Sequence, residues 1–243
     1  MPMQLFDDRY APITSEIGFL ECQANPAADA YVRWTEPIQS ARGVRLHRDE
    51  IQGDFPSRLG RLLPLTSVEH RRSLFLPTRS NWTAYFDNGW QGTDVFSAVS
   101  ELCQKIGCRG VRAVSVPHTM RKTAAGHRGR YGATMLEIYA ADLIGCSFLN
   151  IRRSISAAND GGRWRFDANG EVLDFEEVEH YTARQIRYRF TPDLLNQYLL
   201  KLGIHFFSPA FYDVAQPSYL ISKEGPHAAA MTEYSLDEAR ADF

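Results

Sequence analysis

Hydrophobic and polar positions along the chain follow two different periods, and the period separates predicted strands from predicted helices. Short runs rich in β-branched and aromatic residues favour strands, in which successive side chains point to opposite faces. Such runs predict strands at residues 15–23, 44–47, 73–77, 82–87, 109–117, 131–141, 146–155, 163–166, 171–175 and 218–222.

Helical periodicity is clearest between residues 94 and 106, where apolar side chains recur about every 3.6 positions and Gly107 is suited to end the helix. Asn25 followed by Pro26 is typical of a helix start, and alanines continue the pattern until Pro37 or Gly43. After residue 176 the period becomes helical again. This change predicts one helix over residues 178–190 and a second over residues 191–203.

Turn-forming residues separate the predicted strands. Asp87, Asn88 and Gly89 end the strand at residues 82–87. A second turn at residues 159–162 leads into the strand at 163–166. Residues 167–170 (DANG) predict a tight turn before the strand at 171–175, so these two strands are expected to form a hairpin.

The strands come in runs, with helices between or after them rather than in strict alternation. This order predicts an α+β fold, with an antiparallel or mixed β-sheet and helices packed against it. We expect residues 1–222 to form a single domain. Residues 223–243 are polar and alanine-rich, and we expect a flexible C-terminal tail there.

Composition narrows the class of protein. The 243 residues are 44% hydrophobic and 23% charged, which is typical of globular domains. A net charge of -2 gives no overall basic field, so nucleic acid is not expected as a partner.

No stretch approaches the roughly 18 apolar residues of a membrane span, and the N-terminus lacks signal-peptide features, so a cytoplasmic location is expected. Only four of the 27 basic residues are lysine, which we interpret as the codon bias of a GC-rich bacterial genome.

The most unusual local composition lies between Arg121 and Arg130. Four permanent cations and one histidine share this glycine-containing segment: Arg121, Lys122, His127, Arg128 and Arg130. Such a loop is suited to hold a phosphate or an acidic protein surface. The alternative interpretation is a solvated hairpin loop, because the segment lacks the glycine spacing of a phosphate-binding loop.

Charge is unevenly distributed along the sequence. Residues 42–130 contain 15 basic and seven acidic residues, a net of +8. Residues 160–179 contain seven acidic and two basic residues, a net of -5. If these segments separate in space, the molecule has two oppositely charged sides, which suits association steered by charge.

A cluster of aromatic residues surrounds Asp87. Trp82, Tyr85, Phe86 and Trp90 lie within nine positions, and the first three cannot all face one side of a strand. Trp82, Tyr85 and Trp90 are therefore candidate partner-binding residues; alternatively, one set is core and a helix covers the other. Asp87 stands at a strand end, where acid–base chemistry often occurs, or it bonds the amides of its own turn.

Motifs for catalysis and cofactors are weak. The sequence contains no Gly-x-Ser-x-Gly and no dinucleotide fingerprint, so no cofactor and no catalytic residue is predicted. Cys103 and Cys108 are five positions apart, which fits no standard zinc pair, and the four cysteines are expected to be reduced thiols. A dyad of Cys108 with His118 or His127 remains an alternative. Glu176 or Glu177 with His180 forms at most half a metal site, so no metal is predicted.

Three segments resemble uncharacterised bacterial cytosolic proteins, some of a kind found near polymorphic-toxin loci: residues 76–89 (LPTRSNWTAYFDNG), Thr93-Asp94 with its helix, and residues 160–166 (DGGRWRF). The resemblance implies an immunity-type protein that binds and blocks a toxin-like partner. Immunity proteins are often strongly acidic, and this chain departs from that pattern.

Two hypotheses about function follow. The first is a non-enzymatic protein-binding protein, immunity-like, that uses the arginine-rich loop and exposed aromatics. The second is an enzyme or ligand-binding domain that holds an anionic small molecule near the Arg121–Arg130 loop, with Asp87, His118 or His127 close to it. The second hypothesis requires these residues to converge in one concave pocket.

Overall fold

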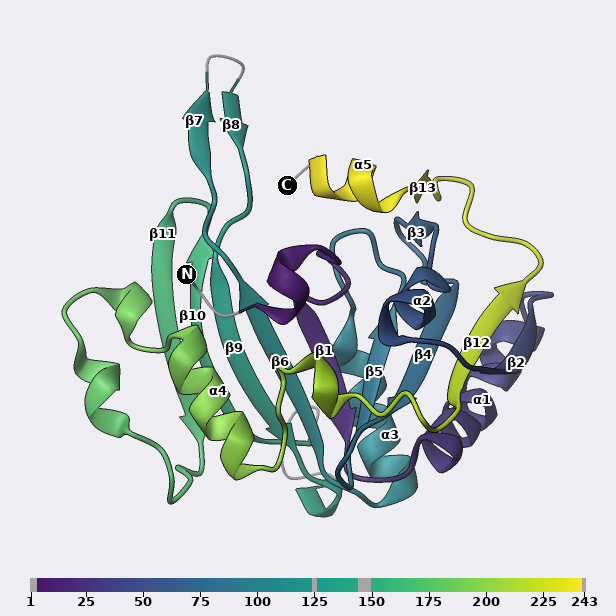
Figure 1. Cartoon of the computed structure of the whole chain (residues 1–243), viewed down its shortest axis with the longest axis horizontal. Helices are drawn as coiled ribbons and strands as arrows, with labels where there is room; N and C mark the ends of the chain where they lie inside the picture. Colours follow the sequence, from purple (N-terminus) through teal and green to yellow (C-terminus); the bar gives the residue numbers. More distant parts are fainter. Residues whose placement is uncertain (1–3, 124–125, 144–149, 242–243) are drawn as a thin grey trace.

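The computed structural model describes residues 4–123, 126–143 and 150–241, and a nine-stranded sheet organises this part of the chain (Figure 1). Its strands are β1 (Glu16–Leu20), β2 (Arg45–Ile51), β4 (Arg72–Pro77), β5 (Thr83–Asp87), β6 (Gly110–Val116), β9 (Ala133–Tyr139), β10 (Ile151–Asp160), β11 (Arg163–Gly170) and β12 (Ser218–Glu224). They lie in the order β11-β10-β9-β6-β1-β5-β4-β12-β2, and every neighbouring pair is antiparallel.

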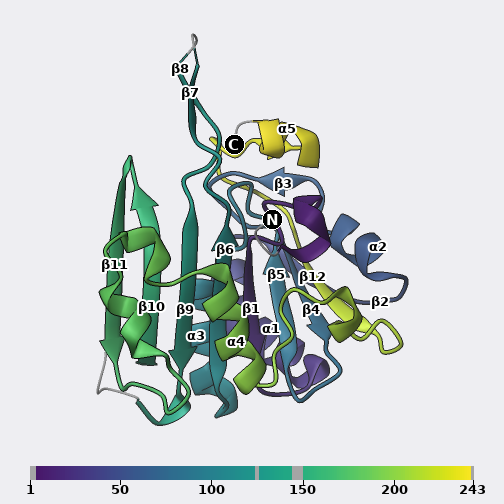
Figure 2. The ribbon, with the colours of Figure 1, turned by 60° about the vertical axis from the view of Figure 1, so that its left-hand side comes forward.

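Helices cover both faces of the sheet, which confirms the predicted α+β class. They are α1 (Ala24–Ser40), α2 (Phe55–Gly60), α3 (Val95–Ile106), α4 (Pro192–Lys201) and α5 (Leu236–Ala241). Figure 2 shows α4 on one side of the sheet, and α1 and α3 on the other. Two hydrophobic clusters correspond to these faces: one contains buried residues of α2 and α4, the other those of α1 and α3.

The central strand β1 shows how the alternating pattern assigns residues to the two faces. Ile17 and Phe19 point into the cluster with α4, whereas Leu20 belongs to the cluster with α1 and α3. Gly18 lies on the α3 side. A Cβ atom at this position would stand 2.6 Å from a methyl group of Val95, so only glycine lets α3 approach the sheet this closely.

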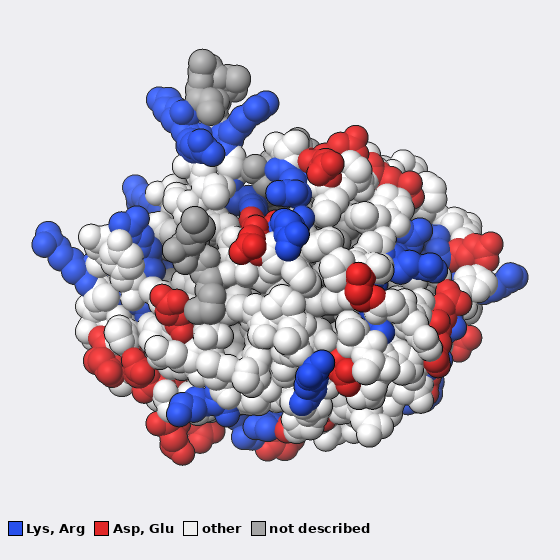
Figure 3. Space-filling model, viewed as in Figure 1, with Lys and Arg blue, Asp and Glu red and all other residues white. Residues whose placement is uncertain are grey.

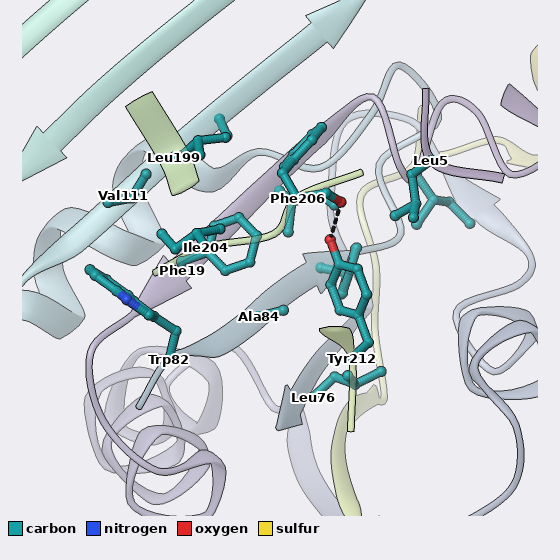
Figure 4. Packing of buried hydrophobic residues seen from close by; sticks show 14 of the residues in the cluster. Leu5, Phe19, Leu76, Trp82, Ala84, Val111, Leu199, Ile204, Phe206 and Tyr212 are labelled. Atoms are coloured by element: carbon teal, nitrogen blue, oxygen red, sulfur yellow. Dashed lines mark hydrogen bonds between the residues drawn. The ribbon is translucent and has the colours of Figure 1, made fainter. Parts of the chain in front are cut away.

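The larger core packs sheet residues such as Phe19 and Ala84 against residues of other segments, such as Leu5 and Tyr212 (Figure 4). Its polar atoms are paired. The Tyr212 hydroxyl donates to the Phe206 carbonyl at 2.9 Å, and the Trp82 indole N–H donates to the Leu202 carbonyl at 2.9 Å. Both side chains are buried, and the bonds remove the penalty of an unpaired polar group in the core.

The structure contradicts three predictions in the second half of the chain: the turn at 167–170, the strand at 171–175 and the helix at 178–190. Residues 167–170 form no turn, because β11 runs unbroken from Arg163 to Gly170 and pairs with β10 along its whole length. The period-two alternation of half-buried and exposed residues continues through Ala168, and pairing along an edge strand outweighs the local turn preference. The chain reverses instead at Gly161 and Gly162, which both have positive φ.

The helix predicted over residues 178–190 is replaced by two short 3-10 segments, η4 (Val178–Thr182) and η5 (Ile186–Tyr188). Neither contains a buried residue. Without an apolar face packed on the core, a short helix gains too little to form. By contrast, α3 and α4 match their predictions closely. Gly107 ends α3 in the left-handed region, and the Thr191 side chain at the start of α4 accepts the Leu194 amide.

The described part of residues 223–243, predicted as a flexible tail, packs against the fold. Strand β13 (Glu233–Tyr234) pairs with β3 (Leu65–Thr66), and Ala239 of α5 is fully buried. The predicted strand at 146–155 corresponds to β10 from Ile151 onward, whereas residues 146–149 lie outside the described part. Among the described helices, none combines the length and the apolar character needed to cross a membrane.

Candidate interaction surface

The arginine-rich segment forms a two-stranded hairpin that stands away from the main sheet. Its strands are β7 (Arg121–Thr123) and β8 (Gly126–Arg128), which pair only with each other. The side chains of Arg121, Lys122 and Arg128 are exposed, and Figure 3 shows basic side chains on both sides of the hairpin, clear of the body. No ion pair is formed by these three residues within the described part of the chain.

The register of the hairpin is electrostatically unfavourable. Arg121 lies directly opposite Arg128. Like charges in directly opposed positions destabilise an antiparallel pair, and an isolated two-stranded ribbon is already marginal in water. Local structure alone therefore gives no reason for two arginines at this pair of positions. Conflicts of this kind are expected where a surface serves binding rather than folding.

The base of the hairpin is anchored, and Arg130 is part of the anchor. The Arg130 carbonyl accepts the amides of Thr119 and Met120 at 3.0 and 3.2 Å. Its guanidinium pairs with Asp8, and the side chain is only 14% exposed. Of the predicted binding residues in this segment, Arg130 thus holds the base, whereas Arg121, Lys122 and Arg128 project. The side chain of His127, also a predicted binding residue, lies outside the part that the structure describes.

Aromatic rings connect the hairpin base to the turn between β10 and β11. The His118 ring lies 6.4 Å from that of Tyr131 and 5.6 Å from that of Trp164, measured between centroids, and its Nδ1 accepts the Gly132 amide at 3.1 Å. Beyond Trp164 lies an open hollow of about 510 Å³ lined by Arg163, Trp164, Gln185, Ile186 and Arg187. Tyr131 is 39% exposed, although it is a large aromatic residue.

We name this region the basic surface: Arg121, Lys122 and Arg128 of the hairpin, with Tyr131, Arg163, Trp164 and Arg187 beside it. Arginine, tyrosine and tryptophan are the residues enriched at the centres of protein–protein interfaces. Sequence reasoning missed the last four residues. Arg163 lies in the segment counted as acidic, so at least this part of the acidic segment belongs to the basic surface.

Two of the predicted aromatic residues are unavailable to a partner in this structure. Trp82 and Tyr85 are each 2% exposed. Trp82 belongs to the core with α4, and Tyr85 packs against Tyr31 and Phe75 on the opposite face of the sheet. The alternative interpretation, with one set in the core and the other covered by a helix, therefore describes them.

Asp87 is fully buried at the N-terminus of α3. Its carboxylate accepts the amides of Gly89 and Asp94, each at 3.0 Å, which is the turn-bonding role considered for it. The Nδ1 of His70 lies 3.4 Å from the second carboxylate oxygen. Burial raises the pKa of Asp87, while the nearby His70 and the donated amides oppose that rise.

A polar cavity of about 320 Å³ lies beside Asp87 and is lined by His70, Trp90, Asp94, Glu16 and Arg112, among others. Arg112 pairs with Glu16 at 2.7 Å and with Glu137 at 3.2 Å. Burial also raises the pKa of Glu16, against the opposing charge of Arg112. This cavity is a second polar site, and none of the described hairpin residues lines it.

Trp90 lies at the wall of this polar cavity, and its ring stacks on Tyr234 at 4.9 Å between centroids. The predicted site residues therefore fall into three places: the projecting hairpin, the interior, and the polar cavity. The convergence of Asp87 and His118 with the arginine-rich segment in one pocket is not observed. His118 lies at the hairpin base, and Asp87 faces the α1–α3 side of the sheet.

The acidic residues before α4 have two different environments, one buried and one exposed. Glu176 is fully buried and pairs with Arg153, so it is not a free ligand. Glu177, Glu179 and His180 are exposed and place one ligand atom each within 4.8 Å of the others. Exposed acidic groups often approach each other in this way without an ion, and no further ligand within the described residues completes the site.

Comparison with known proteins gives no match: no family model, no curated protein and no solved structure resembles this chain.

Proposed function

We propose that this chain is a protein-binding protein of the immunity-like kind, which holds an acidic partner at the basic surface. One observation carries the proposal: Arg121 faces Arg128 across a ribbon that joins no other sheet, and neither residue has an ion pair within the described chain. A negatively charged partner would relieve this repulsion on binding.

The neighbouring residues support a protein partner rather than a nucleic acid. The chain has a net charge of -2, so it has no overall positive field that would attract a nucleic-acid backbone. Trp164 and Tyr131 add aromatic surface, and the open hollow between Arg163 and Arg187 can accommodate a protruding side chain. Rings and guanidinium groups around a shallow hollow are typical of interface anchors.

Affinity capture from a lysate of the source organism tests the proposal. The wild-type chain is compared with a variant carrying Arg121→Glu, Lys122→Glu and Arg128→Glu. We expect one stoichiometric acidic protein with the wild type, lost with the variant, and binding of the purified pair that weakens steeply as salt is raised. Capture that disappears after nuclease treatment would contradict a protein partner.

A matched control separates local from overall charge. Arg33→Glu, Arg42→Glu and Arg45→Glu produce the same change in net charge, and these three exposed residues lie on and next to α1 and β2. This variant is expected to retain the partner. If both variants lose it equally, the interaction depends on net charge and not on the basic surface.

The polar cavity favours a second candidate function, a ligand-binding site. A half-exposed His70 next to a buried Asp87 is an arrangement often found where protons are transferred. Because Glu16 and Asp94 also line the cavity, it suits a neutral or cationic ligand rather than the anionic one considered from the sequence. A thermal-shift screen of amines and polyols tests this candidate. The expected hit stabilises the wild type but not the His70→Gln variant.

A further inference from the structure

Three cysteines from separate segments meet at the end of β6 opposite to the hairpin. Cys22 follows β1, Cys103 lies in the last turn of α3, and Cys108 lies between α3 and β6. Cys103 is fully buried, whereas Cys22 and Cys108 are half-buried and pack against the same hydrophobic cluster. No disulfide joins them in this structure; all three are free thiols.

The pairing of β1 with β6 brings Cys22 close to Cys108. Leu20 pairs with Gly110 at the end of the ladder, and the Glu21 amide donates to the Arg109 carbonyl at 2.9 Å. The chain bends at Cys22, and its thiol lies within hydrogen-bond reach of the Cys108 thiol. A disulfide needs Cβ atoms about 3.5–4.5 Å apart, which two thiols in contact can reach by a small local adjustment.

Cys103 closes the group from the helix side. The Cys108 amide donates to the Cys103 carbonyl at 3.1 Å, which ties the loop to the end of α3. A Cβ atom on Gly110 would stand 2.3 Å from the Cys103 sulfur, so glycine at this position makes room for that sulfur against the sheet. The buried sulfur of Cys103 is thereby fixed behind the two half-exposed ones.

The surroundings of Cys108 favour its thiolate. Hydrogen bonds from Cys103 and then from Cys22 lower the pKa of the Cys108 thiol to about 4. The same contacts, together with burial, raise the pKa values of Cys22 and Cys103. One thiolate and two thiols is the division of charge expected when one sulfur accepts from two neighbours.

We propose that Cys108 and Cys22 form a thiol pair that hydroperoxides oxidise to a reversible disulfide. Accessibility selects Cys22 over Cys103. Cys22 and Cys108 are half-buried residues, whereas Cys103 is 0% exposed. The inference is independent of the basic surface, since the two regions lie at opposite ends of β6.

The chemistry balances in two steps. The Cys108 sulfur attacks one oxygen of the hydroperoxide; an S–O bond forms, the O–O bond breaks, and the departing alkoxide or hydroxide takes up a proton. Sulfur is oxidised to the sulfenic acid and the peroxide is reduced. The Cys22 sulfur then attacks the sulfenic sulfur, an S–S bond forms, and hydroxide leaves with the Cys22 proton as water.

Peptide mapping of the oxidised protein tests the pairing directly. Trypsin places each cysteine of the group in a different peptide: Cys22 in residues 10–33, Cys103 in 80–105 and Cys108 in 106–109. After treatment with hydrogen peroxide and blocking of free thiols, we expect the peptides 10–33 and 106–109 to be linked, and dithiothreitol to separate them. A link between 80–105 and 106–109, or only intermolecular links, would overturn the pairing. Cys146→Ser in every protein leaves these three thiols alone to be counted.

The rate of alkylation tests the thiolate without relying on a disulfide. Between pH 5.5 and 8 the rate at Cys108 should stay nearly constant, whereas the rate of an ordinary thiol rises about tenfold per pH unit. In the Cys22→Ser variant the plateau should persist, and dimedone should trap a sulfenic acid at Cys108. Absence of a dimedone adduct at Cys108 in this variant would contradict the proposal.

Discussion

The arginines of the hairpin and those of the interior have the same chemistry and opposite surroundings. Arg58 is 1% exposed and donates to the carbonyls of Gly53, Val214 and Gln216 and to the Ser218 hydroxyl. Arg153 pairs with the buried Glu176 at 2.6 Å. Arg121 and Arg128, by contrast, face each other in solvent. An arginine-rich sequence therefore does not reveal which of its arginines are available to a partner; only the contacts of each guanidinium do.

The comparison predicts a graded series of effects. An arginine whose donors are all occupied in the interior contributes to stability, and its removal leaves acceptors without partners. An arginine in an exposed ion pair contributes little, because solvent and salt screen the pair. An arginine held opposite another one destabilises its own strand pair.

The largest effect is expected at Arg153. Arg153→Met leaves the buried Glu176 carboxylate without its cation and should lower the free energy of unfolding by about 3–5 kcal/mol, measured by urea denaturation. Adding Glu176→Gln removes the uncompensated charge, so the double variant should be more stable than the single one. If the double variant instead loses the sum of the two separate effects, Arg153 and Glu176 are not coupled. That result would contradict the claim that buried arginines stabilise the fold through their partners.

A smaller, pH-dependent effect is expected at Glu21. The hydrogen bond from Arg109 lowers the pKa of Glu21. A carboxylate with a lowered pKa in the folded state stabilises the protein above its unfolded pKa, near 4.5, and this contribution is lost as pH falls through the folded value. Glu21→Gln should therefore lower stability at pH 7 by less than about 1 kcal/mol, because the Arg109 side chain is 53% exposed and solvent screens the pair, and the difference should vanish at strongly acidic pH. Glu36→Gln, at an exposed position on α1, is the control and should show no such trend.

The smallest effect, and the one of opposite sign, is expected in the hairpin. Arg128→Glu creates an opposite-charge pair with Arg121 and should stabilise the ribbon by about 0.2–1 kcal/mol, seen as slower amide hydrogen exchange at residues 121–123. Arg121→Glu with Arg128→Glu restores a like-charge pair and should abolish the gain. Loss of partner binding together with a more stable ribbon would show that these arginines serve recognition. Faster exchange in the single variant would contradict the assumed register.

Much of the fold was predictable because most elements carry their own periodic signal. The helix at 94–106 combines one apolar face with a terminal glycine, and the strands at 73–77, 82–87 and 109–117 are bounded by turn residues; all of them are present. The failures lie where long-range contacts outweigh local preference. The turn residues at 167–170 are held extended by β10. In 178–190 only Phe190 is buried in the core, and the two 3-10 segments before it contain no buried residue, so no helical face is packed.

The candidate surface was predictable only in part, for the same reason. The density of cations between Arg121 and Arg130 is a local property, visible in the sequence. The positions of Arg163, Trp164 and Arg187 beside it depend on how β9, β10 and β11 pair. The sequence did not predict the cluster of Cys22, Cys103 and Cys108. Cys22 and Cys108 are separated by most of the first half of the chain and come together only because β1 pairs with β6.

The sequence by itself determined the α+β class, the best helices and strands, and the exceptional charge of one hairpin, since these follow from neighbouring residues and their period. The tertiary structure decided which charges of the described residues are paired, that Asp87 bonds its turn amides, and that Cys22 lies close to the distant Cys103 and Cys108. These outcomes depend on burial and on pairs of residues far apart along the chain, because burial and hydrogen bonding are properties of the assembled sheet and not of any single segment.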